Sequence, residues 1–322
     1  MRKTPILLLA ATLTGLASAP ARAEGAPITM IVTVPPGGSS DALARLAATA
    51  LGNRLKQSVV VENVTGAGGL VGMQRFLKAR PDGSTLLFIN QSLTILPHLY
   101  KQAGYSAVAD VAPVGIVAKV PMVLSVSNAS GIQDLPSLIG KMKSAPGTLN
   151  FGSGGPGTTA HFAEALFLQQ AGVQGQLVQY RGTGPALTDL MAGTIHAVID
   201  QTVTMLPLHK DGRVRALAVS AAARVPQAPD VPTFAEAGLP AFDLAIWNGV
   251  VAPKGTPAPT LRRIEQALSD AVAEPELRAR LESLGAQAPT AQERGPQHLR
   301  QLIEQDAGRV EALAKTGVFV AN

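Results

Sequence analysis

The chain has 322 residues, no cysteine and a formal net charge of +5, from 27 Lys and Arg against 22 Asp and Glu. The absence of cysteine excludes disulfides and thiolate metal sites, and a weak positive charge without a basic cluster argues against a nucleic-acid partner. A chain of this length suits one large or two medium domains.

The first 23 residues have the pattern of a secretory signal peptide. Arg2 and Lys3 precede an apolar stretch at 6–17, and Ala21-Arg22-Ala23 fits the small-x-small cleavage rule. We expect cleavage after Ala23 and a periplasmic location, which is compatible with a cysteine-free chain. Loss of three basic residues leaves a mature chain with a charge of +2. The alternative, an uncleaved anchor, is disfavoured because the stretch is shorter than the ~20 residues that span a bilayer.

The mature chain alternates strands with helices in two units of similar order. The first unit has expected strands at 28–34, 59–62 and 85–90, a helix beginning near Ser39 and a short helix at 71–78. Ser39 or Ser40 is a candidate helix cap, and Asp41 falls in the first turn. The second unit has expected strands at 148–151, 176–180 and 195–200, with helices from 158 and up to 191. Such alternation predicts two α/β domains with parallel sheets.

The ends of the chain fit a discontinuous first domain. Strands at 112–119, 122–127 and 244–252 are candidates to cross between domains, and helices at 260–273, 275–284 and 296–315 are expected to cover one face of the first sheet. We therefore place the first lobe at 24–120 and 250–322 and the second lobe at 121–249. Two crossovers predict a hinge and a ligand cleft between the lobes.

Glycine-rich turns follow the first strand of each unit and open a helix. Unpaired amides and the helix dipole make such turns suited to anions, and ligands of α/β sheets bind at the carboxyl ends of strands. The alternative is that they are ordinary tight turns. The candidate residues are Gly37, Gly38 and Ser39 in one turn and Ser153, Gly154, Gly157 and Thr158 in the other.

Other chemistries are poorly supported by the sequence. Gly152, Gly154 and Gly157 match a dinucleotide fingerprint, but the next strand, ending at Arg181, lacks the expected acid. No serine-nucleophile or Walker motif occurs, so we expect neither an enzyme nor a cofactor. An exported α/β hydrolase and a structural surface protein remain rival classes.

Four side chains allow two interpretations each. His161 and Glu164 share a helix face and could hold a metal, although a helix-start hydrogen bond is more usual, and we expect no metal. Arg181 is either a carboxylate partner or a surface residue. Trp247 is either a core residue or a wall of the cleft.

Short motifs lie in the segments 34–41, 61–69, 81–87, 149–161, 180–190, 214–219, 230–240 and 252–257, and they cover nearly the whole mature chain. In this order they resemble a family, the Bug-type receptors of tripartite tricarboxylate transporters. The departures are at 91–96, at Asn248 after the tryptophan, at Gln201–Val203 and near the C-terminus, and they leave the identity of the ligand open.

The resemblance implies a two-lobed periplasmic-binding-protein-like fold of type II. It also implies a small organic acid as ligand, held by backbone amides, hydroxyls and bridging waters, and delivery to membrane transporter subunits, with ligand sensing as the alternative. We expect a monomer. The expected ligand-binding residues are Pro36, Gly37, Gly38, Ser39, Asn90, Gln91, Ser153, Gly154, Gly157, Thr158, Asp200 and Trp247.

Overall fold

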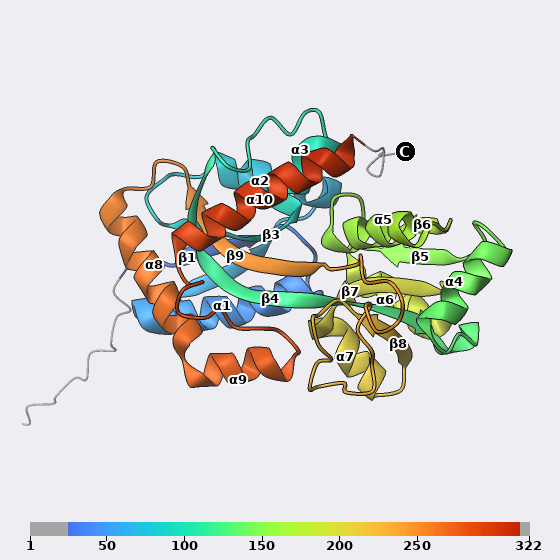
Figure 1. Cartoon of the computed structure of the whole chain (residues 1–322). Helices are drawn as coiled ribbons and strands as arrows, with labels where there is room; N and C mark the ends of the chain where they lie inside the picture. The colour runs from blue at the N-terminus through green and yellow to red at the C-terminus, as the bar shows by residue number, and fades with distance from the viewer. Residues whose placement is uncertain (1–24, 316–322) are drawn as a thin grey trace, which may run out of the picture.

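The computed structural model describes residues 25–315, so the predicted signal peptide and its cleavage point lie outside the described residues. The chain forms mixed α/β structure around two connected groups of strands (Figure 1). The strands are β1 (Ile28–Val32), β2 (Val59–Asn63), β3 (Thr85–Asn90), β4 (Val111–Ser127), β5 (Asn150–Ser153), β6 (Gln176–Gln179), β7 (Ala197–Gln201), β8 (Val214–Val219) and β9 (Ala245–Pro253). The α-helices are α1 (Ser39–Leu55), α2 (Leu70–Leu77), α3 (Ser92–Leu99), α4 (Leu135–Ser144), α5 (Thr159–Ala171), α6 (Thr183–Ala192), α7 (Thr202–Lys210), α8 (Ala258–Ala273), α9 (Pro275–Ser283) and α10 (Pro296–Ala314).

The first lobe is built on the strand order β2-β1-β3-β9-β4. β1 pairs in parallel with both β2 and β3, as the alternating pattern predicts, whereas β9 runs antiparallel to β3. One face of this sheet packs against α1, α8 and α9 through a core that contains Leu43, Ile264 and Leu281. The other face packs against α2, α3 and α10, with Leu299 of α10 in the core.

From the sequence, the C-terminal helices were expected to cover one face of the first sheet. They instead divide between its two faces, with α8 and α9 on one face and α10 on the other. Figure 1 shows α10 above the strands of this lobe, α8 to their left and α9 below them. Only Leu299, Ile303 and Val310 of α10 are fully buried apolar residues, and the last of these packs against the core of the second lobe. α10 thus bridges the two lobes along one side.

The second lobe contains β6, β5, β7, β8 and the second half of β4. α4 and α5 cover one face of these strands and α6 and α7 cover the other. Four phenylalanines strengthen the first of these cores: the Phe151 and Phe167 rings lie 5.9 Å apart, and the Phe234 and Phe242 rings lie 4.3 Å apart. Aromatic pairs of this kind add to the stabilisation from burial alone.

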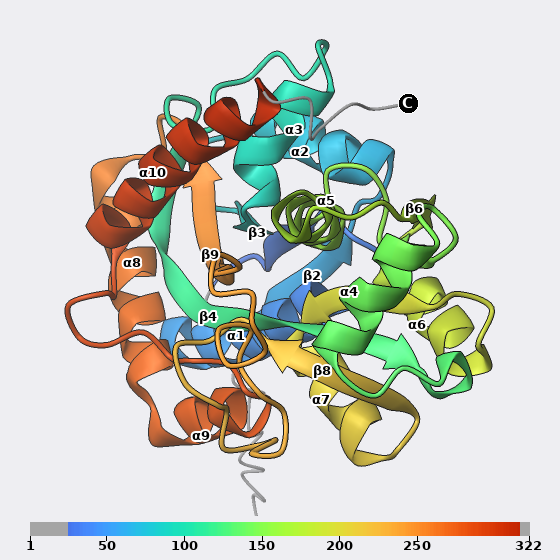
Figure 2. The same ribbon diagram turned by 45° about the vertical axis from the view of Figure 1, so that its right-hand side comes forward.

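β4 is one long strand and not two. Its first part pairs with β9 as far as Pro121, and from Met122 onward it pairs with β7 and β8 instead. Pro121 is tolerated within the strand because the pairing partners change at this point, and proline is normally confined to such irregular positions. β4 runs from one lobe into the other and β9 lies beside it, so these two strands form the connection (Figures 1 and 2).

Candidate functional site

Five helices begin around one cavity between the two lobes. α1 and α3 come from the first lobe, and α5, α6 and α7 come from the second. Each follows a strand directly, so the carboxyl ends of β1, β3, β5, β6 and β7 all point towards this cavity. Sequence reasoning predicted two of these helix starts as binding turns; the structure brings five together.

The cavity wall is polar and presents backbone donors. The first amides of a helix have no partner within it, and each helix start carries about half a positive charge. Among the described residues, the amides of Ser39, Ser40 and Thr159 donate to no protein acceptor. The cavity is therefore suited to a carboxylate or a similar small anion.

Six of the predicted ligand-binding residues line this cavity: Pro36, Gly38, Ser39, Asn90, Thr158 and Asp200. The remaining wall includes Ser40, Gly68, Ser92, Thr159, Gln201 and the turn at 182–184, which were not predicted as site residues. Gly182 and Gly184 were recognisable as a glycine-rich helix start. Gly182 lies against Pro35 of the opposite lobe, and this contact depends on how the two lobes meet, which a local sequence pattern does not determine.

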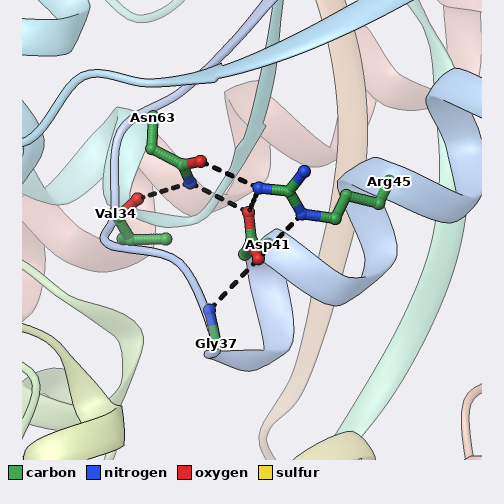
Figure 3. A network of polar contacts seen from close by, with 5 residues as sticks. All are labelled: Val34, Gly37, Asp41, Arg45 and Asn63. Atoms are coloured by element: carbon green, nitrogen blue, oxygen red, sulfur yellow. Dashed lines mark hydrogen bonds and ion pairs between the residues drawn. The ribbon is translucent and has the colours of Figure 1, made fainter.

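The first binding turn is held by a buried carboxylate in place of the predicted serine cap. Gly38 is the N-cap of α1 and makes no side-chain cap. Asp41 instead accepts from the Gly37 amide at 3.1 Å, from Arg45 at 2.9 and 3.0 Å, and from Asn63 at 2.9 Å (Figure 3). Asn63 also donates to the Val34 carbonyl at 3.0 Å, which ties β2 to the turn.

These contacts determine the charge state of Asp41. Burial alone would raise the pKa of its carboxyl group, but the hydrogen bonds from Arg45, Asn63 and Gly37 lower that pKa below its usual value. Gly37 has a φ of 92°, which requires glycine, and its amide is committed to Asp41. The structure does not place Gly37 on the cavity; it shapes the turn that presents Gly38 and Ser39.

The second binding turn is held by its own hydroxyl groups. Thr158 is the N-cap of α5 and accepts from the His161 amide at 3.3 Å, while its hydroxyl also donates to the Gly155 carbonyl at 2.8 Å. Ser153 donates to Gln179 at 2.7 Å and accepts from the Gly155 amide at 3.2 Å. The Ser153 side chain is therefore engaged within the turn and does not line the cavity.

Glycines in the second turn permit close approach to neighbouring elements. A Cβ at Gly157 would lie 2.7 Å from Leu96 of α3, and a Cβ at Gly154 would lie 2.9 Å from Thr183 of α6. Gly154 borders an adjoining groove, and Gly157 packs against the opposite lobe. Their observed role is packing, and direct ligand contact by either remains a prediction.

The lobes touch across the cavity at several points. The Ser39 hydroxyl of α1 lies 3.1 Å from the Thr204 hydroxyl and 3.5 Å from Asp200 Oδ2. A Cβ at Gly68 would lie 1.8 Å from the Pro156 carbonyl oxygen, so these backbones are also in close contact. These contacts hold the two lobes close together beside the cavity.

Asp200 is the acidic residue of the cavity wall. It is 3% exposed, at the end of β7, and burial raises its pKa to about 6, although hydrogen bonds from Thr204, Gln201 and Ser39 oppose the shift. A second buried carboxyl group, Glu164 on α5, is fully buried and accepts from the Ile199 amide at 3.4 Å. Burial, and to a smaller extent the charge on Asp200, raise the pKa of Glu164 well above its usual value.

Gln91 and Trp247 lie behind the cavity and not on its wall. Both donate to Asp306 of α10, Gln91 at 3.2 Å. Trp247 is 3% exposed and packs in the first lobe's core, as in the core interpretation of this residue. Beside it, Asn248 of β9 donates to Gln201, which does line the cavity, at 3.1 Å.

A groove adjoins the cavity on the surface between the lobes. It shares Pro35, Thr158 and Gly182 with the cavity wall and is also lined by Tyr100 and Arg181. Arg181 is exposed and forms no ion pair among the residues that the structure describes. It therefore stands at the edge of the groove and not in the cavity.

Within residues 25–315, no group of three His, Cys, Asp or Glu side chains could hold a metal ion. Over the same range, no helix combines the length and the hydrophobicity needed to cross a membrane.

Two α/β lobes joined by extended strands, with a polar cavity at their junction, define a solute-binding protein. Residues 43–317 match the family model of the tripartite tricarboxylate transporter family receptor, and the chain belongs to this family. It is 35% identical over 285 residues to Protein BugT of Bordetella pertussis, covering 88% of this chain and 86% of BugT. The predicted membership of the Bug-type receptors is confirmed.

Solved structures show the same fold. The periplasmic binding protein BugD is 32% identical with a TM-score of 0.86, covering 91% of this chain and 98% of BugD. MatC of Rhodopseudomonas palustris, solved with bound malate, is 32% identical with a TM-score of 0.85, covering 89% and 98%. An R. palustris protein solved with adipate is 32% identical with a TM-score of 0.85, covering 90% and 96%. The predicted two-lobed α/β fold is confirmed, and the family consists of periplasmic solute-binding receptors and not of enzymes.

Proposed function

We propose that this chain is a periplasmic receptor that captures a small organic carboxylate by closing its lobes and delivers it to a tripartite tricarboxylate-type membrane transporter. The observation that carries the proposal is the convergence of five helix N-termini on one cavity between the lobes. Relatives solved with malate and adipate support a carboxylate ligand. The proposal includes cleavage after Ala23 and action as a monomer.

The small size of the cavity supports the proposal that the lobes move. Its volume is about 40 Å³, which is room for only a few water-sized groups. Contacts at Ser39–Thr204 and Gly68–Pro156 hold the lobes close together beside it. An acid of several carbons exceeds this volume, and we propose that it enters as the lobes separate by hinge motion at the β4–β9 connection, with lobes at 24–120 plus 250–322 and at 121–249.

The carboxylate claim is tested by thermal denaturation of the mature protein against a panel of small acids. A ligand present at ~100 times its dissociation constant adds about 2.7 kcal/mol to the free energy of unfolding. We expect at least one acid to raise the melting temperature while its amide and alcohol analogues do not. Equal stabilisation by the neutral analogues would contradict recognition of a carboxylate.

The transporter claim needs a separate experiment. Deletion of the gene should abolish uptake of the stabilising acid, and the Gly38→Val protein should fail to restore it. Normal uptake in the deletion strain would favour the second candidate, a sensing receptor without a transporter of its own.

A further inference from the structure

Gln201 is a cavity-wall residue whose side-chain amide is only half used by the protein. It ends β7, is 1% exposed and lines the cavity. It is the N-cap residue of α7, but its side chain makes no cap. Its Oε1 accepts from Asn248 Nδ2 at 3.1 Å, whereas its Nε2 donates to no acceptor among the described residues and is not enclosed by protein atoms. The Nε2 hydrogens are therefore free to bond a group in the cavity.

Asn248 determines which end of the Gln201 amide faces the cavity. Asn248 Nδ2 donates to Gln201 at 3.1 Å and to the Ile246 carbonyl at 3.3 Å. A backbone carbonyl can only accept, so the Asn248 atom beside Ile246 must be the nitrogen. The same nitrogen faces Gln201, where only an oxygen can accept from it. Gln201 is thereby held with its oxygen towards β9 and its nitrogen towards the cavity.

This orientation suits an anionic ligand. A carboxylate oxygen accepts hydrogen bonds and cannot donate them. Ser39, Ser40 and Thr159, whose backbone amides are unpaired, line the same cavity. The Nε2 group adds a donor to this set, whereas an outward Oε1 would repel a carboxylate. Hydrogen bonds to a charged acceptor are also stronger than neutral ones.

Asn248 is unfavourable as a purely structural residue. It is fully buried on β9, where it is paired with Asn90 of β3 and Ala118 of β4. Its Oδ1 has no partner among the described residues, and a buried polar atom without a partner destabilises the folded state. An apolar residue would avoid that cost, so the contact with Gln201 is the feature that accounts for an asparagine here.

We propose that Gln201 donates directly to a carboxylate oxygen of the bound acid and that Asn248 is its positioning residue. The proposal rests on the proposed carboxylate-binding function and adds a side-chain donor to the backbone donors of the cavity. The competing explanation is that the two residues only hold β9 against β7. In that case the Gln201 amide would have no contact with the ligand.

The first test is nuclear magnetic resonance of isotope-labelled mature protein. The probe is the acid that binds most tightly among acetate, succinate, malate and adipate. The side-chain amide resonances of Gln201 are identified by their absence from the spectrum of Gln201→Met. A saturating amount of the acid should move one of these protons downfield, because it gains a hydrogen bond to a charged acceptor. A contact that only joins the strands would leave both protons near their ligand-free positions.

Calorimetry then separates the roles of the two residues. Gln201→Met removes the donor and should weaken binding at least about tenfold. Asn248→Leu removes only the group that orients the donor, so it should weaken binding about threefold and reduce the ligand-induced shift at Gln201. In the Gln201→Met background it should cost less than about twofold. A purely structural contact would give equal losses in the two single variants, since either substitution breaks it.

Trp247→Phe is the matched control on the same strand. The Trp247 indole donates to Asp306 and not to Gln201, and neighbouring residues of a strand point to opposite faces. This substitution should leave the Gln201 shift in place, and it should change affinity by the same factor in wild type and in Gln201→Met. Circular dichroism establishes that each variant is folded, and Asn248→Ala replaces Asn248→Leu if the leucine variant is not.

The outcomes are distinguishable. An acid that binds without a shift at Gln201, or that binds Gln201→Met with wild-type affinity, overturns the proposal and leaves carboxylate capture intact. Equal losses in Gln201→Met and Asn248→Leu overturn the positioning role of Asn248. Binding of none of these acids contradicts carboxylate capture itself and the proposal with it.

Discussion

Gly68 and Pro156 bring the backbones of the two lobes into contact: a Cβ on Gly68 would lie 1.8 Å from the Pro156 carbonyl oxygen. The obstructing atom belongs to the backbone, so rotation of a side chain cannot relieve the clash. Gly68→Ala should therefore hold the lobes apart. We expect at least a tenfold loss of affinity, about 1.4 kcal/mol, and a larger radius of gyration in small-angle scattering with saturating ligand.

Gly131→Ala is the matched control for Gly68→Ala. Gly131 has a φ of 69°, close to the 64° of Gly68, so alanine is similarly strained at both positions. A Cβ at Gly131 meets nothing within 4 Å. Wild-type binding and scattering by Gly68→Ala would show that this contact does not limit closure.

We expect a substitution at Gly38 to block ligand binding by filling the space beside this residue and not by straining the backbone. Its φ of −90° and ψ of 173° suit any residue, so the backbone conformation at this position does not require glycine. A Cβ there meets nothing within 4 Å although Gly38 lines the cavity. Gly38→Val should abolish ligand binding without lowering the melting temperature, as measured by calorimetry and circular dichroism.

The control for Gly38→Val is Gly140→Val on the exposed side of α4, where the added side chain also meets nothing. It should bind ligand normally. If Gly38→Val bound with wild-type affinity, the ligand would have to occupy another part of the molecule.

The order of elements was predictable because buried strands and helix starts leave local patterns. Residues 85–90 form β3 as predicted, and Asn90 at its end does line the cavity. The link from Asp41 to Asn63 was not predictable, since it joins side chains 22 positions apart on different elements. The same applies to Gly182, whose contact with Pro35 exists only once both lobes are folded.

Arg181 should affect the rate of binding more than the affinity. It is exposed on the groove outside the cavity, and an exposed charge attracts an anion mainly during approach. We expect Arg181→Ala to change the dissociation constant by less than about threefold and to reduce the salt dependence of the association rate. Stopped-flow measurements at two ionic strengths test this, with Arg213→Ala, an exposed residue off the groove, as the control.

A large loss of affinity in Arg181→Ala would give a different picture of the site. A desolvated bidentate pair with the ligand would cost roughly 2–5 kcal/mol when broken. That result would replace recognition by helix amides with recognition by an arginine.

Asp41 should stabilise the first binding turn in a pH-dependent manner. Because its pKa is lowered in the folded protein, its contribution is present above the ordinary carboxyl pKa and is lost as the pH falls through the folded value. Asp41→Asn should destabilise the protein by roughly 2 kcal/mol at neutral pH and weaken ligand binding through the displaced turn. Urea denaturation should show the difference from wild type shrinking below about pH 4. A constant difference at every pH would mean that the charge of Asp41 has no part in it.

Glu164 should have the opposite effect on stability. It is fully buried, one carboxyl oxygen has no partner among the described residues, and its pKa is raised by burial and by Asp200. The pKa of the Glu164 carboxyl group is higher in the folded protein than its unfolded value of 4.5. The free energy of unfolding is therefore greatest below pH 4.5, and it falls as the pH rises towards the folded pKa. Wild type should therefore lose stability between about pH 5 and pH 8 through this residue.

Glu164→Gln removes that loss because the amide is neutral at every pH and can still accept from the Ile199 amide. Its advantage over wild type in melting temperature should be smallest near pH 5 and grow towards pH 8. Glu304→Gln, at an exposed position on α10, should run parallel to wild type across the same range. Parallel melting curves for Glu164→Gln and wild type would show that Glu164 does not change its protonation between these pH values.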